Sequence, residues 1–291
     1  MAKILAIETS CDETAAAVVQ NGRTVLSNII YSQADIHAEY GGVVPEIASR
    51  KHIEVIDKVI NQALDKADLN FDTIDAVAVT SCPGLVGALL TGVSYAKGIS
   101  YAKKIPLISV HHIKGHICAN YIEYPDLKPP FLCLVVSGGH SQIVHVKNYL
   151  HYEILAKTRD DAAGEAFDKV ARILGLPYPG GVDIDKMSAY GNPDKITFTK
   201  PKMGETDDFS FSGIKTALNC YIKKITNQPI TSIKNDQVIT DQPFSGLGLV
   251  VSEGGLTKND IAASFSKAMA EMLISPLIKL AKEKQITKIA L

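Results

Sequence analysis

The sequence lacks an excess of charge, a cysteine pattern and a long apolar run. Its 30 Lys and Arg residues balance 31 Asp and Glu residues, so the net charge is −1 and no overall basic field attracts nucleic acid. An RNA partner would therefore have to bind at a local patch or through other subunits. The five cysteines include no C-x-x-C pair, and an odd, scattered set is typical of a reducing compartment.

No stretch of the chain is apolar over the length that a membrane span requires, and no signal peptide precedes the first strand pattern. We therefore expect a cytoplasmic protein without a membrane partner. With 291 residues, of which 46% are apolar and 21% charged, the chain has the composition of a soluble globular protein of one large or two medium domains.

Strand and helix patterns alternate along the first part of the chain. Short apolar runs separated by polar turns predict three antiparallel strands at residues 3–8, 15–19 and 24–31. Helical spacing of apolar residues then predicts an amphipathic helix over 45–69. A buried-type strand at 74–80, a small-residue helix over 85–102 and another strand at 106–110 follow.

Residues 131–148 repeat the pattern of the opening, with a buried strand, a Gly-containing turn and a returning strand. A third strand at 152–156 and helices at 163–174 and 182–190 continue it. This duplication predicts an α/β protein of two similar lobes, residues 1–130 and 131–291, around a nucleotide cleft. That is the plan of the actin, Hsp70 and sugar-kinase (ASKHA) fold. Two unrelated hairpins are the alternative.

Three of the eight histidines fall between the strand at 106–110 and a helix predicted over 116–121. His112 and His116 are four residues apart, so a helix that started early would project both imidazoles from one face. Two imidazoles one turn apart form half of a four-coordinate metal site, which a carboxylate or a substrate atom could complete. Helix capping or a buried polar contact is the alternative.

Several polar positions fit the predicted cleft. Ser137-Gly138-Gly139 offers backbone N–H groups to phosphate oxygens, although an ordinary hairpin has the same composition. Asp12 and Glu13 are adjacent carboxylates at the first turn and could position a hydroxyl, an amine or a metal-bound water, or simply be solvated. Pro179-Gly180-Gly181 precedes a helix, so its amides could face an anion or a ribose. Under the two-lobe arrangement, Asp168 and Asp185 lie on helices that point toward the same region.

Six motifs in order along the chain resemble the TsaD family, the tRNA threonylcarbamoyladenosine transferases related to the archaeal and eukaryotic Kae protein and formerly called O-sialoglycoprotein endopeptidases. They are IETSCDET, HHIKGH, LVVSGGHS, GEAFDKVARILGL, YPGG with DIDK, and DFSFSGIKTAL. The resemblance runs from Lys3 to Leu291. The string ADIHAEYGGVVPEIASRKH resembles the bacterial and organellar branch.

The resemblance implies a reaction and a set of site residues. Members of the family transfer the threonylcarbamoyl group of threonylcarbamoyl-AMP to N6 of adenosine 37 in tRNAs that read codons beginning with A. The positions that match the family's metal ligands are His112 and His116, and the metal is iron or, as the second choice, zinc. The positions that match its substrate-binding residues are Val135, Val136, Ser137, Gly138, Gly139, Asp168, Gly181 and Asp185. Asp12 and Glu13 resemble its acidic pair and are assigned a positioning or proton-handling role.

The resemblance also implies partners: a TsaB-like paralogue that forms a heterodimer and a TsaE-like ATPase, besides tRNA and the adenylate.

The sequence departs from the family's pattern in two places. The chain stops at Leu291, within an apparent buried strand, before the family's Asn that binds substrate and Asp that completes the metal site, which suggests a fragment with weak metal affinity. Residues 227–255 are longer than the family's pattern and predict a surface loop.

The last long segment, 257–280, opens with a near capping box at Thr257 and Asp260, and Pro276 is expected to kink or stop its helix. Two other functions remain open, as does a non-catalytic scaffold if this truncated chain is the whole natural product. A kinase or ATPase of the same fold would hold Mg²⁺ with carboxylates and water, and the histidine pair disfavours it. A zinc peptidase would need a Glu directly after the first histidine, where this chain has Ile113.

Overall fold

The structure is a computed structural model that describes residues 1–201, 203–226, 230 and 233–291. The chain divides into two compact units, Met1–Leu127 and Lys128–Leu291. Each unit has its own sheet and its own hydrophobic core, and each is described by itself below.

The first unit is built on a five-stranded sheet with the strand order β3-β2-β1-β4-β5. The strands are β1 (Lys3–Glu8), β2 (Glu13–Gln20), β3 (Thr24–Ser32), β4 (Ala76–Cys82) and β5 (Leu107–His111). The first three form an antiparallel meander, whereas β4 joins β1 in parallel and β5 joins β4 in parallel. The predicted strands of this region are therefore present, and the parallel pairs bring the ends of β1, β4 and β5 to one edge.

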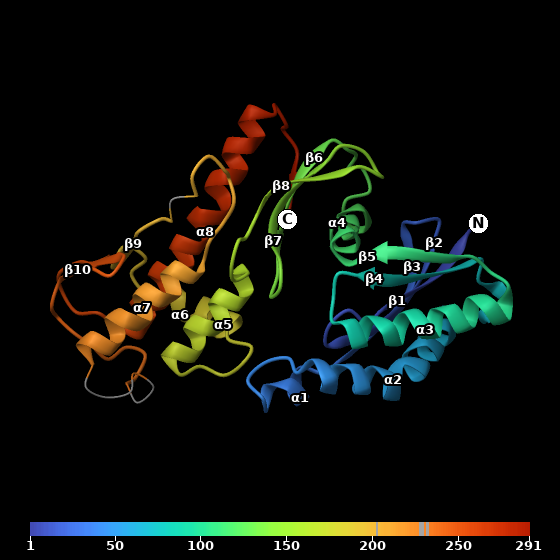
Figure 1. The fold of residues 1–291 in the computed structure, drawn as a ribbon, viewed down its shortest axis with the longest axis horizontal. Helices are drawn as coiled ribbons and strands as arrows, with labels where there is room; N and C mark the ends of the chain where they lie inside the picture. The colour runs from blue at the N-terminus through green and yellow to red at the C-terminus, as the bar shows by residue number, and fades with distance from the viewer. Residues whose placement is uncertain (202, 227–229, 231–232) are drawn as a thin grey trace. The chain divides into compact units, whose positions relative to one another are not determined.

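Helices cover both faces of this sheet, with α2 (Pro45–Lys66) and α3 (Val86–Lys103) on one face and α4 (His112–Glu123) on the other (Figure 1). The alternation of side chains along the strands sends Leu5 and Val77 into the core under α2. The opposite face carries small residues such as Ala6 and Ala78 and leaves a hollow of about 260 Å³ beside Glu8 and Gly115. A short helix, α1 (Ala34–Ala38), lies between β3 and α2.

The second unit repeats the strand plan of the first. Its main sheet has the order β12-β6-β7-β8, with β6 (Phe131–Val136), β7 (Ser141–Val146), β8 (Tyr152–Lys157) and β12 (Ile289–Ala290). The strands β6, β7 and β8 form an antiparallel meander, and β12 joins β6 in parallel, as β4 joins β1. The predicted duplication is thus confirmed at the level of strand order and direction.

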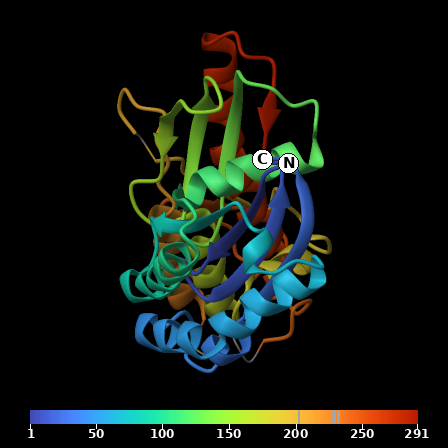
Figure 2. The same ribbon diagram turned by 90° about the vertical axis from the view of Figure 1, so that its right-hand side faces the viewer.

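Four helices build the core of the second unit: α5 (Ala163–Leu174), α6 (Gly181–Ser188), α7 (Ser212–Ile225) and α8 (Lys258–Glu283). The helix α5 has the predicted bounds and ends at Gly175, whose φ of 78° suits glycine at a helix terminus. The buried side chains of α8, including Phe265 and Met269, pack in this core. Figure 2 shows α8 in red behind the green strands of the main sheet.

Two predictions for the C-terminal part need correction, the helix end at Pro276 and the surface loop over 227–255. The helix α8 runs through Pro276 instead of stopping there, because its buried face continues past the proline to Leu277 and Leu280. Its predicted capping box is present at Thr257 and Asp260. The final strand pattern forms β12, which pairs in parallel with β6, and Ile289 is 46% exposed.

The predicted surface loop over 227–255 contains part of a second, three-stranded sheet with the order β10-β11-β9. Its strands are β9 (Ile196–Phe198), β10 (Phe244–Gly246) and β11 (Leu249–Val251). Leu249 and Val251 are buried in the main core of this unit, so this stretch is structural. Residues 227–229 and 231–232 of the predicted loop lie outside the described residues.

By length and composition, one described helix, α8, could cross a membrane, and 44% of its most apolar window is buried inside the protein. Core helices of soluble proteins pass the same test, and the apolar residues of α8 contribute to the core of the second unit.

Candidate metal and substrate sites

The histidine pair lies where β5 ends and α4 begins. The helix starts at His112, four residues before its predicted start, so His112 and His116 are one turn apart on the same face. Their Nε2 atoms are 3.0 Å apart, and their rings meet edge to face with centroids separated by 4.4 Å. Two imidazole nitrogens that converge in this way can bind one ion together.

A carboxylate, that of Glu8, contacts the ring nitrogen of His112 that is turned away from His116. Nδ1 of His112 is 3.2 Å from Oε2 of Glu8 and 3.2 Å from the Ser10 hydroxyl. Burial by itself raises the pKa of Glu8, but hydrogen bonds from the side chains of His112, Ser10 and Thr80 outweigh burial and lower it to about 2. Glu8 is therefore ionised at neutral pH, and it orients His112 with the other ring nitrogen turned toward His116. A carboxylate that holds the second nitrogen of a ligating histidine is a regular feature of metal sites.

Burial, and then the neighbouring His112, lowers the pKa of His116, which favours the neutral imidazole that binds metal ions. The donor set thus fits a divalent ion such as iron or zinc. Among the residues that the structure describes, no three His, Cys, Asp or Glu side chains form a group that could hold a metal ion. An ion at this pair would need its remaining ligands from water, substrate or other groups.

The turn that carries Asp12 and Glu13 is tied to its surroundings. The carbonyl of Asp12 accepts a hydrogen bond from the amide of Gln33, at 3.0 Å. Burial raises the pKa of Glu13, and the negative charges of Asp12 and Glu8 raise it further, while His112 acts in the opposite direction. Glu13 therefore shares an electrostatic environment with Asp12, Glu8 and His112.

In the second unit, the turn between β6 and β7 has the form that the sequence predicted. The amide of Ser137 donates to the carbonyl of His140 at 2.8 Å, and the amide of His140 donates to the Ser137 hydroxyl at 3.1 Å. A Cβ atom added at Gly138 or Gly139 would meet no atom within 4 Å, so the turn is open on that side. Of the two residues before it, Val135 is buried and Val136 is 45% exposed.

The remaining predicted substrate-binding residues lie where α5 meets α6. The carboxylate of Asp168 on α5 accepts the amide of Gly180 at 2.8 Å, directly before the first residue of α6, Gly181. Asp185 follows one turn later on the same face of α6 and is exposed. The structure thus joins Asp168 to the start of α6, the helix that carries Gly181 and Asp185.

Sequence reasoning missed Glu8 and His52 as residues of the first site. Glu8 ends β1, and the parallel pairing of β1, β4 and β5 carries it to the edge where His112 begins α4; the order of the strands would have revealed this. His52 is fully buried on α2, with Nε2 2.9 Å from the carbonyl of Cys11 beside the acidic pair. A lone histidine on a helix gives no comparable signal in the sequence.

Two sheets with the same meander and the same parallel fourth strand, each packed with helices, define the class of actin, Hsp70 and the sugar kinases. The crystal structure of component A of the (R)-2-hydroxyglutaryl-CoA dehydratase from Acidaminococcus fermentans has a similar fold. The TM-score is 0.51 with 12% sequence identity, over 96% of this chain and 79% of that chain. The predicted fold class is confirmed.

The model of the TsaD family, tRNA N6-adenosine threonylcarbamoyltransferase, matches residues 24–291. The chain is 55% identical to the protein of that name from Clostridium novyi (strain NT), over 99% of this chain and 78% of the relative. It is also 55% identical to the one from Clostridium perfringens (strain 13), over the same shares. The chain belongs to the family of tRNA N6-adenosine threonylcarbamoyltransferases and is a transferase that modifies tRNA.

Proposed function

We propose that this chain transfers the threonylcarbamoyl group from threonylcarbamoyl-AMP to N6 of adenosine 37, in tRNAs that read codons beginning with A. The N6 amine attacks the carbamoyl carbon, a new C–N bond forms, the bond from that carbon to the phosphate oxygen breaks, and AMP leaves. The N6 proton passes to a base. Because the substrate is a mixed anhydride, its carbon is already activated, and the protein has mainly to bind and orient the two reactants.

The observation that carries this proposal is the distance of 3.0 Å between Nε2 of His112 and Nε2 of His116, with Glu8 behind His112. We assign these two imidazoles to one divalent ion, iron before zinc. When bound there, such an ion would act as a Lewis acid and would stabilise negative charge that develops on a carbonyl oxygen. Glu8 fixes the ring of His112 in the orientation that this role requires.

The other predicted site residues bind the adenylate and orient the reacting groups. We assign the adenylate to the open turn Ser137–Gly139, where the amides of Gly138 and Gly139 can receive the phosphate, with Val135 and Val136 leading into it. The Ser137 amide already donates to the carbonyl of His140. Asp168, Gly181 and Asp185 would hold the nucleoside part. Glu13 shares the electrostatic environment of Asp12 and His112, and we assign to the two carboxylates the positioning of the reacting groups and the removal of the N6 proton.

We further propose a cytoplasmic location and two protein partners, a TsaB-like paralogue and a TsaE-like ATPase. A net charge of −1 supports the need for partners, since the chain by itself has no basic field for tRNA. The odd, scattered set of five cysteines supports a reducing compartment.

Transfer can be tested with the chain, its partners, threonylcarbamoyl-AMP and a tRNA that reads codons beginning with A. Mass spectrometry of the digested tRNA should detect the modified adenosine, and AMP should appear in equal amount. His112→Ala and His116→Ala should each abolish transfer and bound metal, whereas His151→Ala, at an exposed histidine, should leave both unchanged. Transfer by His112→Ala at the wild-type rate would refute the assignment.

The same preparation separates the other two functions. A kinase or ATPase would turn over a sugar or ATP without tRNA, and we expect no such turnover. A peptidase would cleave casein in a manner that depends on His112. The position that would carry the catalytic Glu of such an enzyme is Ile113, which is 3% exposed and faces the interior, so we expect no cleavage.

A further inference from the structure

The first turn of α5 is in contact with both ends of the turn between β6 and β7. The amide of Gly164 donates to the carbonyl of Ser137 at 3.2 Å. The amide of the preceding residue, Ala163, donates to the hydroxyl of Ser141 at 2.9 Å, and Ser141 is buried. Two successive amides of one helix therefore hold the start and the end of the segment 137–141.

Only glycine fits at position 164. An added Cβ atom would lie 2.8 Å from the Cα of Gly138, 2.8 Å from the carbonyl oxygen of Ser137 and 2.9 Å from the amide nitrogen of Gly138. All three are backbone atoms, which cannot rotate away as the end of a side chain can. Any side chain at this position must therefore push the helix and the turn apart.

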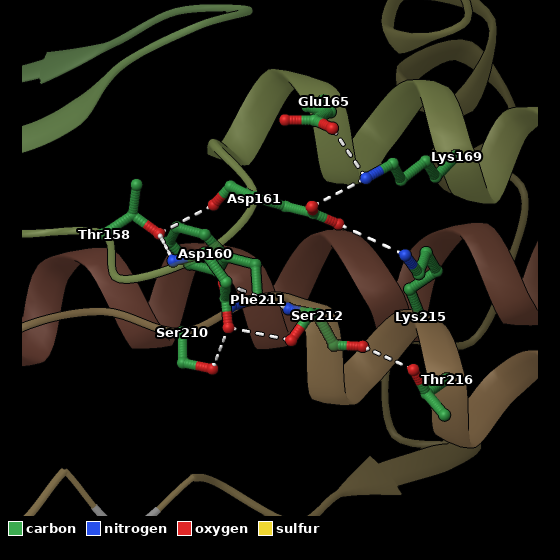
Figure 3. A network of polar contacts seen from close by, with 10 residues as sticks. All are labelled: Thr158, Asp160, Asp161, Glu165, Lys169, Ser210, Phe211, Ser212, Lys215 and Thr216. Atoms are coloured by element: carbon green, nitrogen blue, oxygen red, sulfur yellow. Dashed lines mark hydrogen bonds and ion pairs between the residues drawn. The ribbon is translucent and has the colours of Figure 1, made fainter.

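The helix is anchored on its other side, as Figure 3 shows. In the loop before α5, the carboxylate of Asp160 accepts hydrogen bonds from the Ser210 hydroxyl at 2.5 Å, the Phe211 amide at 2.8 Å and the Ser212 hydroxyl at 2.8 Å. These residues lie at the start of α7. The loop before α5 is thus tied to a second helix.

The carboxylate of Asp161, the next residue, also links the loop before α5 to α7. Asp161 forms ion pairs with Lys169 on α5, at 2.6 Å, and with Lys215 on α7, at 3.4 Å. Its carbonyl accepts the hydroxyl of Thr158 at 2.7 Å. Because Asp160 and Asp161 hold the start of α5 against α7, a side chain added at position 164 would displace the turn rather than the helix.

We infer that Gly164 is a positioning residue, which sets the turn Ser137–Gly139 at the place where it receives the phosphate of the adenylate. Asp168 lies one turn further along the same face of α5 and holds the amide of Gly180. One helix thus fixes both parts of the site assigned to the nucleotide. This inference rests on the proposed function, in which that turn binds the phosphate.

The test compares Gly164→Ala with Gly213→Ala in the full chain. Gly213 is the second residue of α7, and a Cβ atom there would meet nothing within 4 Å, so it is a matched control. AMP affinity is measured by calorimetry, and hydrogen–deuterium exchange is followed in residues 137–141. We expect Gly164→Ala to weaken AMP binding about tenfold or more and to speed exchange in that segment. Gly213→Ala should change neither quantity.

Wild-type affinity for AMP together with unchanged exchange in Gly164→Ala would overturn the inference. If the wild-type chain itself bound no AMP, the assignment of the adenylate to this turn would fail, while the exchange data would still decide whether Gly164 positions the turn. Should Gly164→Ala fail to fold, Ser141→Ala replaces it, because it removes an acceptor and adds no atom. It should weaken AMP binding about threefold, and wild-type affinity in that variant would overturn the inference.

Discussion

The hydroxyl of Thr14 lies 2.7 Å from Nδ1 of His52, and both side chains are fully buried. The other ring nitrogen of His52 lies 2.9 Å from the carbonyl of Cys11. A neutral imidazole satisfies both contacts, since one nitrogen accepts the hydroxyl proton and the other donates to the carbonyl. His52 therefore connects α2 to both sides of the turn that carries Asp12 and Glu13.

The first prediction concerns pH and stability. Burial lowers the pKa of His52 below 6.5, against the opposing effect of the Cys11 carbonyl, Glu8 and Asp12, while His37 adds to the lowering. The unfolded chain thus takes up this proton first as the pH falls. The free energy of unfolding should not change above about pH 7 through this residue, and should decrease below pH 6.5 by at most about 1.4 kcal/mol per pH unit.

The measurement is urea unfolding of the wild type and of His52→Gln at pH 7.5 and 5.5. The variant is less stable at pH 7.5, because it loses the fit of the imidazole, but its stability should decrease less on acidification. His151→Gln, at an exposed position, should follow the wild type. An equal decrease in the wild type and in His52→Gln would contradict the prediction.

The second prediction concerns Glu8 and the ion. Glu8→Gln keeps an acceptor beside Nδ1 of His112 but removes the negative charge that orients and strengthens this ligand. We expect the affinity for zinc or iron to decrease about 10- to 100-fold, as measured by competition with a coloured chelator. Glu39→Gln, at an exposed position, is the control. Undiminished affinity in Glu8→Gln would show that the charge of Glu8 does not strengthen His112 as a ligand.

The third prediction concerns Asp160, which caps the start of α7. Burial raises the pKa of this carboxyl, but hydrogen bonds from Ser210, Phe211 and Ser212 outweigh burial and lower it below 3.8. Its stabilising effect is therefore complete above about pH 4 and lost as the pH falls through the lowered value. Asp160→Asn should cost about 1 kcal/mol in urea unfolding at pH 7, and less at pH 3. Asp126→Asn, at an exposed carboxyl, should cost nothing measurable, and an equal loss in both variants would exclude the capping role.

The fourth prediction concerns the small sheet of the second unit. Leu249 on β11 is 2% exposed and belongs to the main core, whereas the next residue, Val250, is 47% exposed. Leu249→Ala should lower the free energy of unfolding by about 2–5 kcal/mol, and Val250→Ala should change it by less than about 0.5 kcal/mol. If both variants had the stability of the wild type, the stretch 244–251 would be a dispensable loop after all.

Much of the fold is predictable from the sequence because it follows from local patterns. The strand at 3–8 and the helix at 163–174 have the bounds that their apolar spacing indicates. The orientation of His112 and His116 follows from their separation along one helix. The repeated strand-turn-strand pattern likewise indicates the duplicated fold.

Contacts between distant segments are not predictable in the same way. Glu8 and His112 are separated by 104 positions, and only the order of the strands brings them together. The pairing of β11 with β9 joins residues more than fifty positions apart within a polar stretch that has no strand pattern of its own. At Pro276, local propensity predicts a kink or a helix end, and the helix end is wrong because α8 continues to pack in the core beyond the proline.

The path from Glu8 to His112 crosses three neighbouring strands, β1, β4 and β5, and the pairing of β4 with β5 shifts between Thr80 and Cys82. A slip of one residue in either parallel pair would turn the carboxylate to the other face of the sheet and remove it from the imidazole. With an ion bound as proposed at His112 and His116, its retention would report whether these strands are correctly aligned. Measuring the release of a bound ion as the denaturant concentration rises would therefore follow the unfolding of the first sheet separately from the unfolding of the rest of the chain.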